Sequence, residues 1–253
     1  MSVPDTSLYV YAIVPAGTAL PDGAEGVGSP PATVRTVDAG PLAAVVSAAP
    51  AALRARRRDL LAHQNLLTAL ADAGPLLPMR FGAVTPDERT LRERLAAAEA
   101  EHLATLERLA GHVEINVKAL PARDALAALV TGDATVRRLR DAARRRPGYE
   151  ADVRLGQAVA AALSRRAAEA GKRALHSLAS MARAAATGPE VQGCALNVSF
   201  LVARADTERF RAAAERFAAA HQEHVELRLA GPLPCYSFVD TRPPAPSAAT
   251  GGA

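Results

Sequence analysis

The sequence has no tryptophan, only 4% aromatic residues and only two cysteines among 253 residues. Cys194 and Cys235 can form at most one disulfide, and they lack the C-x-x-C spacing of a redox or zinc motif. No apolar run approaches the ~20 residues that cross a bilayer, and the first residues lack the positively charged segment of a signal peptide. These absences predict a reduced, soluble, cytoplasmic protein with no membrane partner.

The sequence also lacks the short motifs of common catalytic sites. It contains no G-x-x-x-x-G-K-[ST] or G-x-G-x-x-G phosphate-binding pattern and no G-x-S-x-G nucleophile pattern. His221 and His224 are three residues apart, but no third ligand follows at a metal-site spacing, so two solvated histidines at a helix end are favoured over a zinc site. We therefore predict no catalytic residue, no metal and no cofactor, and a protein that is not an enzyme.

The charge balance is basic but mixed, with 30 Lys and Arg against 26 Asp and Glu. Arginines cluster at residues 54–58 and 144–146, which suggests nucleic acid as a partner. Single-strand binding also needs aromatic side chains for stacking, and only Tyr149 is near either cluster. No helix-turn-helix, RRM or zinc-finger signature accompanies them. A solvated helix face is the favoured interpretation, and an arginine-driven nucleic-acid binder remains an alternative.

The periodicity of apolar residues predicts the fold class. Residues 8–14 form an unbroken apolar run typical of a buried strand, and residues 112–120 alternate as a half-buried strand does. Strand groups interleaved with helices predict an α+β fold with ferredoxin-like β-α-β elements. A long helical segment rich in alanine and arginine interrupts them. The length allows one large domain or two ordinary ones, and the tail at 241–253 is expected to be disordered.

One nonapeptide, "GPLLPMRFG" at residues 74–82, has an unusual composition. Gly74 and Pro75 are typical of the end of a helix. After the nonapeptide, Thr85 is predicted to cap the next helix, with Glu88 completing a capping box. No enzyme motif fits the segment.

Four segments together are similar to a known family: "LYVYAIV", "HQNLLTALADAGPLLPMRFG", "VEINVKAL" and "GPLPCYSFV". Their order and spacing resemble the GvpL/GvpF family of gas vesicle proteins. The sequence departs from the family pattern within "PLPCYSF", where an aromatic residue or a second proline is commoner. The residues that match the family pattern are Tyr9, Tyr11, His63, Leu77, Pro78, Arg80, Phe81, Gly82, Glu114, Lys118, Gly231, Pro232, Pro234, Tyr236, Ser237 and Phe238.

The resemblance implies two α+β domains, an N-terminal one at 1–120 and a C-terminal one with a helical insertion at 121–240, in which these residues are mainly structural. Met79 and Phe81 are expected to fill the core on one face of their segment. Arg80 is expected on the other face, where its guanidinium could bind a carboxylate or backbone carbonyls. The segment at 231–238 is expected to play the matching part in the second domain.

The resemblance also implies a function. It predicts a non-enzymatic accessory or minor structural protein that binds the hydrophobic gas vesicle shell subunit, and possibly other accessory proteins, and supports assembly. Its location would be the cytoplasm, associated with gas vesicles. The alanine faces of residues 149–186 are expected to offer the apolar surface for this contact. A cofactor-binding enzyme on a ferredoxin-like fold is a further alternative.

Overall fold

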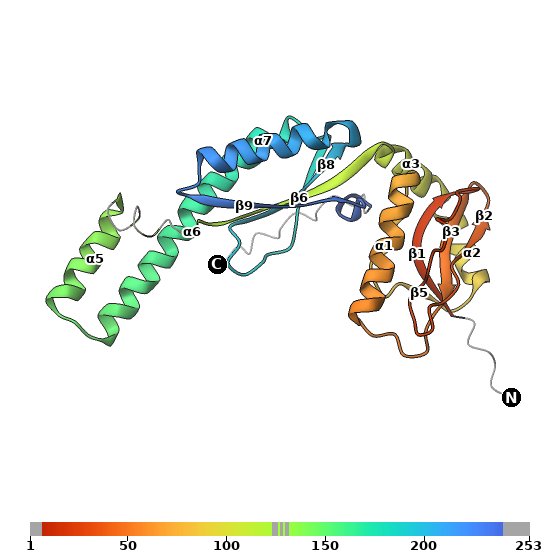
Figure 1. The fold of residues 1–253 in the computed structure, drawn as a ribbon, viewed down its shortest axis with the longest axis horizontal. Helices are drawn as coiled ribbons and strands as arrows, with labels where there is room; N and C mark the ends of the chain where they lie inside the picture. Colours follow the sequence, from red (N-terminus) through yellow and green to blue (C-terminus); the bar gives the residue numbers. More distant parts are fainter. Residues whose placement is uncertain (1–6, 123–125, 127–128, 130–131, 240–253) are drawn as a thin grey trace, which may run out of the picture. The chain divides into compact units, whose positions relative to one another are not determined.

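The computed structural model describes residues 7–239, apart from 123–125, 127–128 and 130–131. The described chain divides into two compact units, one made of residues 7–111 and 234–239 and the other of 112–233. Each unit combines helices with an antiparallel sheet, which confirms the α+β class (Figure 1). The predicted disordered tail at 241–253 lies outside the described residues.

This division differs from the predicted boundary between residues 120 and 121. Strand β6 (His112–Pro121) belongs to the second unit, because it pairs with β8 (Leu196–Ala203) and β9 (Val225–Leu233) of that unit's sheet. Residues 234–239, at the other end, belong to the first unit. The alternation in β6 identifies a strand, but the pattern does not specify which sheet the strand joins.

The sheet of the first unit is built around β1 (Leu8–Pro15). A hairpin of β2 (Arg35–Ala39) and β3 (Leu42–Ala48) pairs with one side of β1. The short strands β4 (Leu77–Pro78) and β5 (Val84–Thr85) pair with the other side. The first seven residues of β1 are buried on both faces, as its unbroken apolar run predicts.

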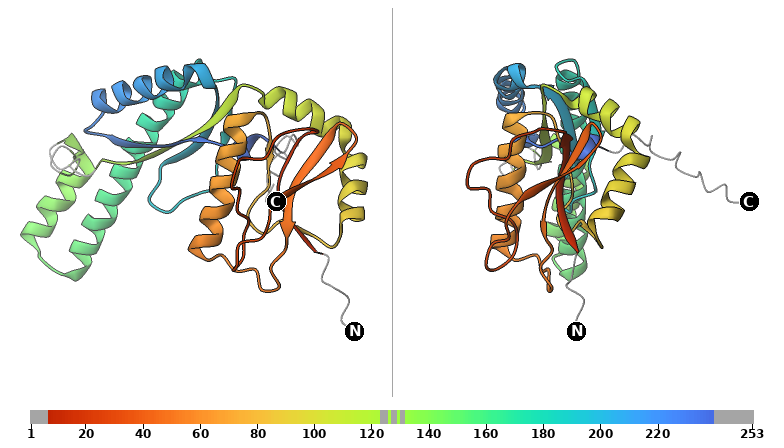
Figure 2. Two further views of the ribbon diagram at one scale, coloured as in Figure 1. Left: turned by 45° about the vertical axis from the view of Figure 1, so that its right-hand side comes forward. Right: turned by 90° about the vertical axis from the view of Figure 1, so that its right-hand side faces the viewer.

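Helices cover both faces of this sheet. In Figure 2, α1 (Arg57–Ala73) lies on one side, and α2 (Glu88–Ala97) and α3 (Glu99–Leu109) lie on the other. The helix α1 buries residues at a spacing of three or four, which places them on one face. These residues are His63, Leu66, Leu67 and Leu70.

The predicted N-cap of α2 is wrong by two residues. Thr85 pairs with Leu8 as part of β5, whereas the side chain of Asp87 accepts a hydrogen bond from the Thr90 N–H at 2.7 Å. The residue before a proline favours extended backbone, which allows Thr85 to pair within the sheet, and Asp87 then supplies the cap. The capping-box spelling from Thr85 to Glu88 is coincidental, and Glu88 instead pairs with Arg35 at 2.8 Å.

The second unit has the ferredoxin-like order β-α-β-β-α-β. Apart from the inserted helix α5 (Ala134–Arg145), its helices and strands after β6 are α6 (Tyr149–Ala179), β7 (Ala184–Thr187), β8, α7 (Thr207–Ala220) and β9. The sheet order is β7-β8-β6-β9 with every neighbouring pair antiparallel, which is the arrangement of a split β-α-β fold. The first unit has different connectivity, because β2 and β3 follow β1 without an intervening helix.

Two short 3-10 helices complete the described elements. The first, η1 (Arg204–Asp206), joins β8 to α7 in the second unit. The second, η2 (Tyr236–Phe238), follows β9 and belongs to the first unit.

Helix α6 packs closely against the sheet of the second unit through small residues. Its alanines 167, 170 and 174 are fully buried. A Cβ added at Gly171 would lie 3.1 Å from the Cβ of Ala119 in β6, so the helix and sheet backbones approach closely. The expected free apolar surface on the alanine faces of residues 149–186 is therefore wrong for these positions, because the sheet already covers them.

The first half of α6 packs instead against α5 (Ala134–Arg145), and the two helices form a hairpin that extends beyond the sheet (Figure 1). The hairpin has a small core of its own, formed by Leu129, Val136 and Ala162. This hairpin corresponds to the predicted helical insertion.

We expect Gly231 in β9 to tolerate no side chain. Its φ of 137° is unfavourable for other residues, and an added Cβ would lie 2.7 Å from the backbone oxygen of Glu114. Gly231→Ala should therefore lower the free energy of unfolding by about 2 kcal/mol or more, measured by urea denaturation.

Gly156 provides a matched control in the same unit. It lies within α6, and an added Cβ would have no atom within 4 Å. Gly156→Ala should raise the free energy of unfolding by about 1 kcal/mol, because alanine favours the helix. Similar effects of the two substitutions would contradict the close approach at Gly231.

Candidate functional site

The residues that match the family pattern fall into two groups. Most lie in the first unit: Tyr9, Tyr11, His63, Leu77, Pro78, Arg80, Phe81, Gly82, Pro234, Tyr236, Ser237 and Phe238. The others lie in the second unit: Glu114, Lys118, Gly231 and Pro232. The first group contains a buried network of polar and aromatic side chains, which is the candidate functional site.

The centre of the network is the contact between Tyr9 in β1 and His63 in α1. The Tyr9 hydroxyl lies 2.9 Å from Nδ1 of His63, and Nε2 of His63 lies 3.1 Å from the carbonyl oxygen of Met79. Because a carbonyl only accepts, Nε2 carries the proton, and in the neutral ring Nδ1 accepts from the Tyr9 hydroxyl. That hydroxyl in turn accepts from the Gly82 N–H at 3.2 Å. These bonds join a strand, a helix and the turn at 79–82.

Aromatic packing surrounds these hydrogen bonds. The rings of Tyr9, Tyr11, His63 and Phe81 contact one another with centroids 4.7–5.9 Å apart, mostly tilted or edge to face. Phe81 packs against the core cluster from a partly buried position. Its edge-to-face contacts with Tyr9 and His63 add to the burial energy.

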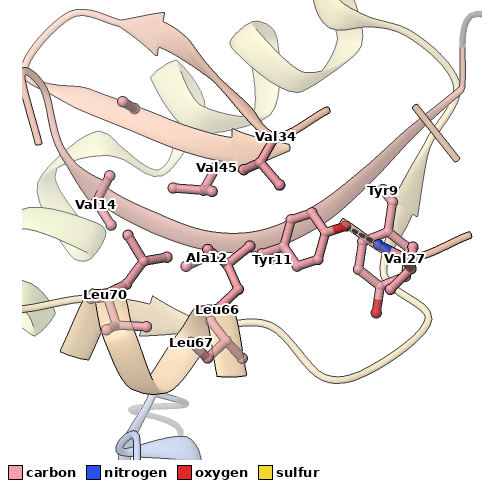
Figure 3. Packing of buried hydrophobic residues seen from close by; sticks show 12 residues of the cluster. Tyr9, Tyr11, Ala12, Val14, Val27, Val34, Val45, Leu66, Leu67 and Leu70 are labelled. Atoms are coloured by element: carbon pink, nitrogen blue, oxygen red, sulfur yellow. Dashed lines mark hydrogen bonds between the residues drawn. The ribbon is translucent and has the colours of Figure 1, made fainter. Parts of the chain in front are cut away.

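Tyr11 forms a second branch of the network. Its hydroxyl lies 2.9 Å from Oγ of Ser47 in β3 and accepts from the Val27 N–H at 2.8 Å, the dashed line in Figure 3. The next amide, Gly28 N–H, donates to Oδ1 of Asp59 in α1 at 2.9 Å. The Gly- and Pro-rich loop between β1 and β2 is thus tied to the sheet and to α1.

Sequence reasoning did not identify Ser47 or Asp59. One signal for Ser47 was available, since it is a single polar residue within the apolar strand Leu42–Ala48. Asp59 follows an arginine cluster and reads as an ordinary surface residue, yet it is buried. Only the folded loop shows why a buried carboxylate is needed at that position.

Burial sets the protonation states in the network. It lowers the pKa of His63 below its usual 6.5, although the hydrogen bond to Met79 opposes this. It raises the pKa of Tyr9 to about 12 and also raises the pKa of Tyr11. At neutral pH the imidazole is therefore neutral and both phenols keep their protons. With Tyr9 and Tyr11 at 0% exposure, the network can hold chain segments together but has no accessible nucleophile.

The nonapeptide contributes residues to both the core and the surface. Leu77 and Pro78 are buried in β4, opposite Ile13 and Ala12. Gly82 has a φ of 94°, which favours glycine. Arg80 is exposed, and within the described residues its side chain has none of the carboxylate or carbonyl partners expected for it.

The C-terminal signature is divided between the two units, which corrects its expected place in the second domain. Gly231 and the exposed Pro232 lie in β9, an edge strand where proline is tolerated. In the first unit, Tyr236 packs against the core cluster around Tyr9. The backbone oxygen of Phe238 accepts from Arg108 at 2.8 Å. The segment leaves the sheet after Leu233, so its aromatic residues enter the other core.

Glu114 and Lys118 lie on the face of β6 that points away from α6 and α7. Glu114 is buried, whereas Lys118 is half-buried and pairs in register with Asn197 and Arg228. Between them, the Asn116 amide donates to Asn197 Oδ1 at 2.9 Å and to Ser199 Oγ at 3.1 Å. This face is a polar ladder, in contrast to the apolar face beneath the helices.

The histidine pair does not form a metal site in the described part of the chain. Nδ1 of His221 donates to the carbonyl of Phe217 at 2.9 Å, and its ring stacks on the Phe217 ring. Among the described residues, no group of three His, Cys, Asp or Glu side chains could hold a metal ion. None of the helices in those residues is long and apolar enough to cross a membrane.

Comparison with known proteins decides the family. The family model described as "Gas vesicle synthesis protein GvpL/GvpF" matches residues 7–240. The chain belongs to the GvpL/GvpF family. Gas vesicle protein F of Streptomyces sp. (strain CB03234) is 40% identical, and the match covers 92% of this chain and 100% of that protein. Gas vesicle protein L of the same strain is 33% identical over 92% of this chain and 93% of that protein.

Solved structures support the same fold for this GvpL/GvpF chain. The crystal structure of GvpF from Anabaena sp. PCC7120 matches with a TM-score of 0.72 and 23% identity, over 94% of this chain and 99% of that one. GvpF from Microcystis aeruginosa matches with a TM-score of 0.71 and 22% identity, over 93% and 99%. At these identities the likeness concerns the fold.

Removing the Tyr9 hydroxyl should destabilise this GvpL/GvpF protein. Tyr9→Phe leaves the His63 ring nitrogen and the Gly82 N–H without a partner in a buried site. We expect the free energy of unfolding to fall by about 1–3 kcal/mol, measured by urea denaturation. Tyr149→Phe is the control, because Tyr149 is 85% exposed; its effect should stay within about 0.5 kcal/mol. Equal effects would argue against the network.

Acidification should also destabilise the protein through His63. The folded pKa of His63 is below 6.5, so the unfolded state binds more protons as the pH falls through 6.5, and stability decreases there. His63→Gln should lose less stability than the wild type between about pH 7.5 and about pH 5.5, in thermal unfolding.

His102 requires a separate variant, because burial lowers its pKa as well. His102→Gln should remove only its own part of the pH dependence, and the double variant should remove both parts. An unchanged pH dependence in His63→Gln would show that the buried imidazole does not titrate as the structure indicates.

Proposed function

We propose that this GvpL/GvpF protein is a non-enzymatic accessory or minor structural component that binds the hydrophobic shell subunit of gas vesicles and supports their assembly. It would act in the cytoplasm and on growing vesicles, together with other gas vesicle proteins. The family description, which names gas vesicle synthesis, supports the assembly role. The names of its relatives support the association with gas vesicles.

The observation that carries the binding proposal is a pair of exposed leucines on α1. Leu60 and Leu61 are 41% and 45% exposed on the side of the helix that faces solvent. A hollow of about 280 Å³ also lies between α1 and the Gly- and Pro-rich loop, lined on the helix by Ala62, the residue after Leu61, and by Asn65, Leu66 and Ala69. Exposed apolar side chains suit an apolar partner.

The buried network gives this surface a fixed shape. His63, two residues after Leu61 in α1, is hydrogen-bonded to Tyr9 and to the carbonyl of Met79. Asp59, next to Leu60, holds the loop through Gly28. Helix and loop are thus preorganised, which reduces the entropy lost when a partner binds. In this proposal the residues of the family pattern position the binding surface and do not themselves contact the shell subunit.

Co-expression with the shell subunit tests the proposal. The wild type should keep the subunit in the soluble fraction and co-purify with it at high salt, because apolar contact is not screened by ions. Leu60→Gln/Leu61→Gln should reduce the co-purified subunit at least severalfold, measured by quantitative gel or mass spectrometry.

A second double variant controls for the loss of exposed apolar surface in general. Tyr149→Gln/Val153→Gln removes two exposed apolar side chains of the second unit, where Val153 is 38% exposed. This variant should retain the subunit. If it loses as much subunit as the α1 variant, α1 is not the binding surface. If the wild type leaves the subunit aggregated, the proposed function itself fails.

A further inference from the structure

One concentration of positive charge is the hairpin of α5 and the first half of α6. Residues 133–166 contain nine arginines and four acidic residues, a net charge of +5. The whole chain has a net charge of only +4. The rest of the molecule is therefore close to neutral, and the hairpin carries a local field that a partner can sense.

Arginines on α5 lie opposite its packed face. The helix buries Val136 and Ala143 toward α6, whereas Arg138, Arg144 and Arg145 are exposed. Arg138 and Arg145 are seven residues apart, as are Arg137 and Arg144, so each pair repeats at about 10 Å along the axis on one side of the helix. The solvent face of α5 thus presents two rows of guanidinium groups.

Most acidic residues of the hairpin already have partners within it. Asp133 caps α5 through the amides of Thr135 and Val136 and lies 3.6 Å from Arg165. Glu150 pairs with Arg154 at 3.2 Å, and Asp141 lies 3.7 Å from Arg140.

Several arginines remain without such a contact. Within the described residues, the side chains of Arg138, Arg144 and Arg146 make no hydrogen bond or ion pair. These guanidinium groups are available to an external anion.

We propose that the solvent face of α5, with the adjoining turn at residues 144–148, is a docking surface for an acidic helical segment of a partner protein. Carboxylates seven residues apart on a helix repeat at the same spacing as the arginine rows. The planar guanidinium binds carboxylates with two parallel hydrogen bonds. This surface is separate from the leucine pair on α1 and does not depend on the shell-subunit proposal.

A protein segment fits this surface better than a nucleic acid does. Single-strand binding relies on several stacking aromatics. Tyr149 is the single aromatic residue in 133–166 and is exposed at the turn. The hairpin therefore has charge without a stacking platform.

The test uses the full chain and a fluorescent alanine-based helical peptide with glutamates at seven-residue spacing. Fluorescence anisotropy at about 100 mM salt should show binding to the wild type. The triple variant Arg138→Glu/Arg144→Glu/Arg146→Glu should bind the peptide about tenfold more weakly or worse.

A matched control changes the net charge equally at exposed positions outside the hairpin. Arg94→Glu/Arg209→Glu/Arg216→Glu should change the affinity by less than about twofold. A neutral triple variant has glutamine in place of arginine at 138, 144 and 146 and should weaken peptide binding to an intermediate degree. It replaces the charge-reversal variant if circular dichroism shows that the charge-reversal variant misfolds.

Three results would overturn the proposal. The wild type could fail to bind the peptide. The control triple variant could lose as much affinity as the hairpin variant, which would indicate attraction by the net charge of the whole chain. A DNA duplex of matched charge could bind more tightly than the peptide at the same salt concentration, which would make the hairpin a nucleic-acid surface.

Discussion

The hydrogen bond between the Tyr9 hydroxyl and the His63 imidazole is the contact on which the first unit depends. Tyr9 lies on the central strand of the sheet, and His63 lies on the helix that covers one face. The carbonyl of Met79 accepts a hydrogen bond from His63, and the Gly82 N–H donates one to the Tyr9 hydroxyl. The turn at 79–82 is therefore bonded to both the strand and the helix. In a dry core each of these groups needs its partner, because an unpaired polar group there is costly. The requirement fixes three chain segments at once.

Much of this arrangement was predictable from the sequence, because it follows from local pattern. The unbroken apolar run of β1 indicated a strand buried on both faces, and strands interleaved with helices indicated the α+β class and the ferredoxin-like order of the second unit. Tyr9, His63 and Phe81 were identified through the family pattern. Ser47, which bonds Tyr11, and Asp59, which bonds the loop at Gly28, were not. Ser47 and Asp59 acquire their roles only when a loop folds onto the sheet, and no local period reports such a contact.

Amino-acid composition was a poor predictor of which helix face is exposed where the helix is rich in alanine. The alanines of α6 suggested a free apolar face, but small side chains also allow a helix to approach a sheet closely. Gly171 and Ala119 show this second use, with little space between helix and strand. The first half of the same helix packs on α5, and its partners there are Val136 of α5 and Leu129, which precedes α5. One helix therefore contributes both to the core under the sheet and to the small core of the hairpin.

The division of the C-terminal signature has a consequence for the order in which the protein forms during translation. Domains usually fold in sequence as they leave the ribosome. Until residues 234–238 have been synthesised, the core of the first unit lacks the packing of Tyr236. Arg108 also lacks its hydrogen-bond acceptor, the carbonyl of Phe238. The second unit can therefore be complete while the first still awaits its last segment. A nascent chain released before residue 234 would expose part of the core around Tyr9, so the most N-terminal unit is the last to be finished.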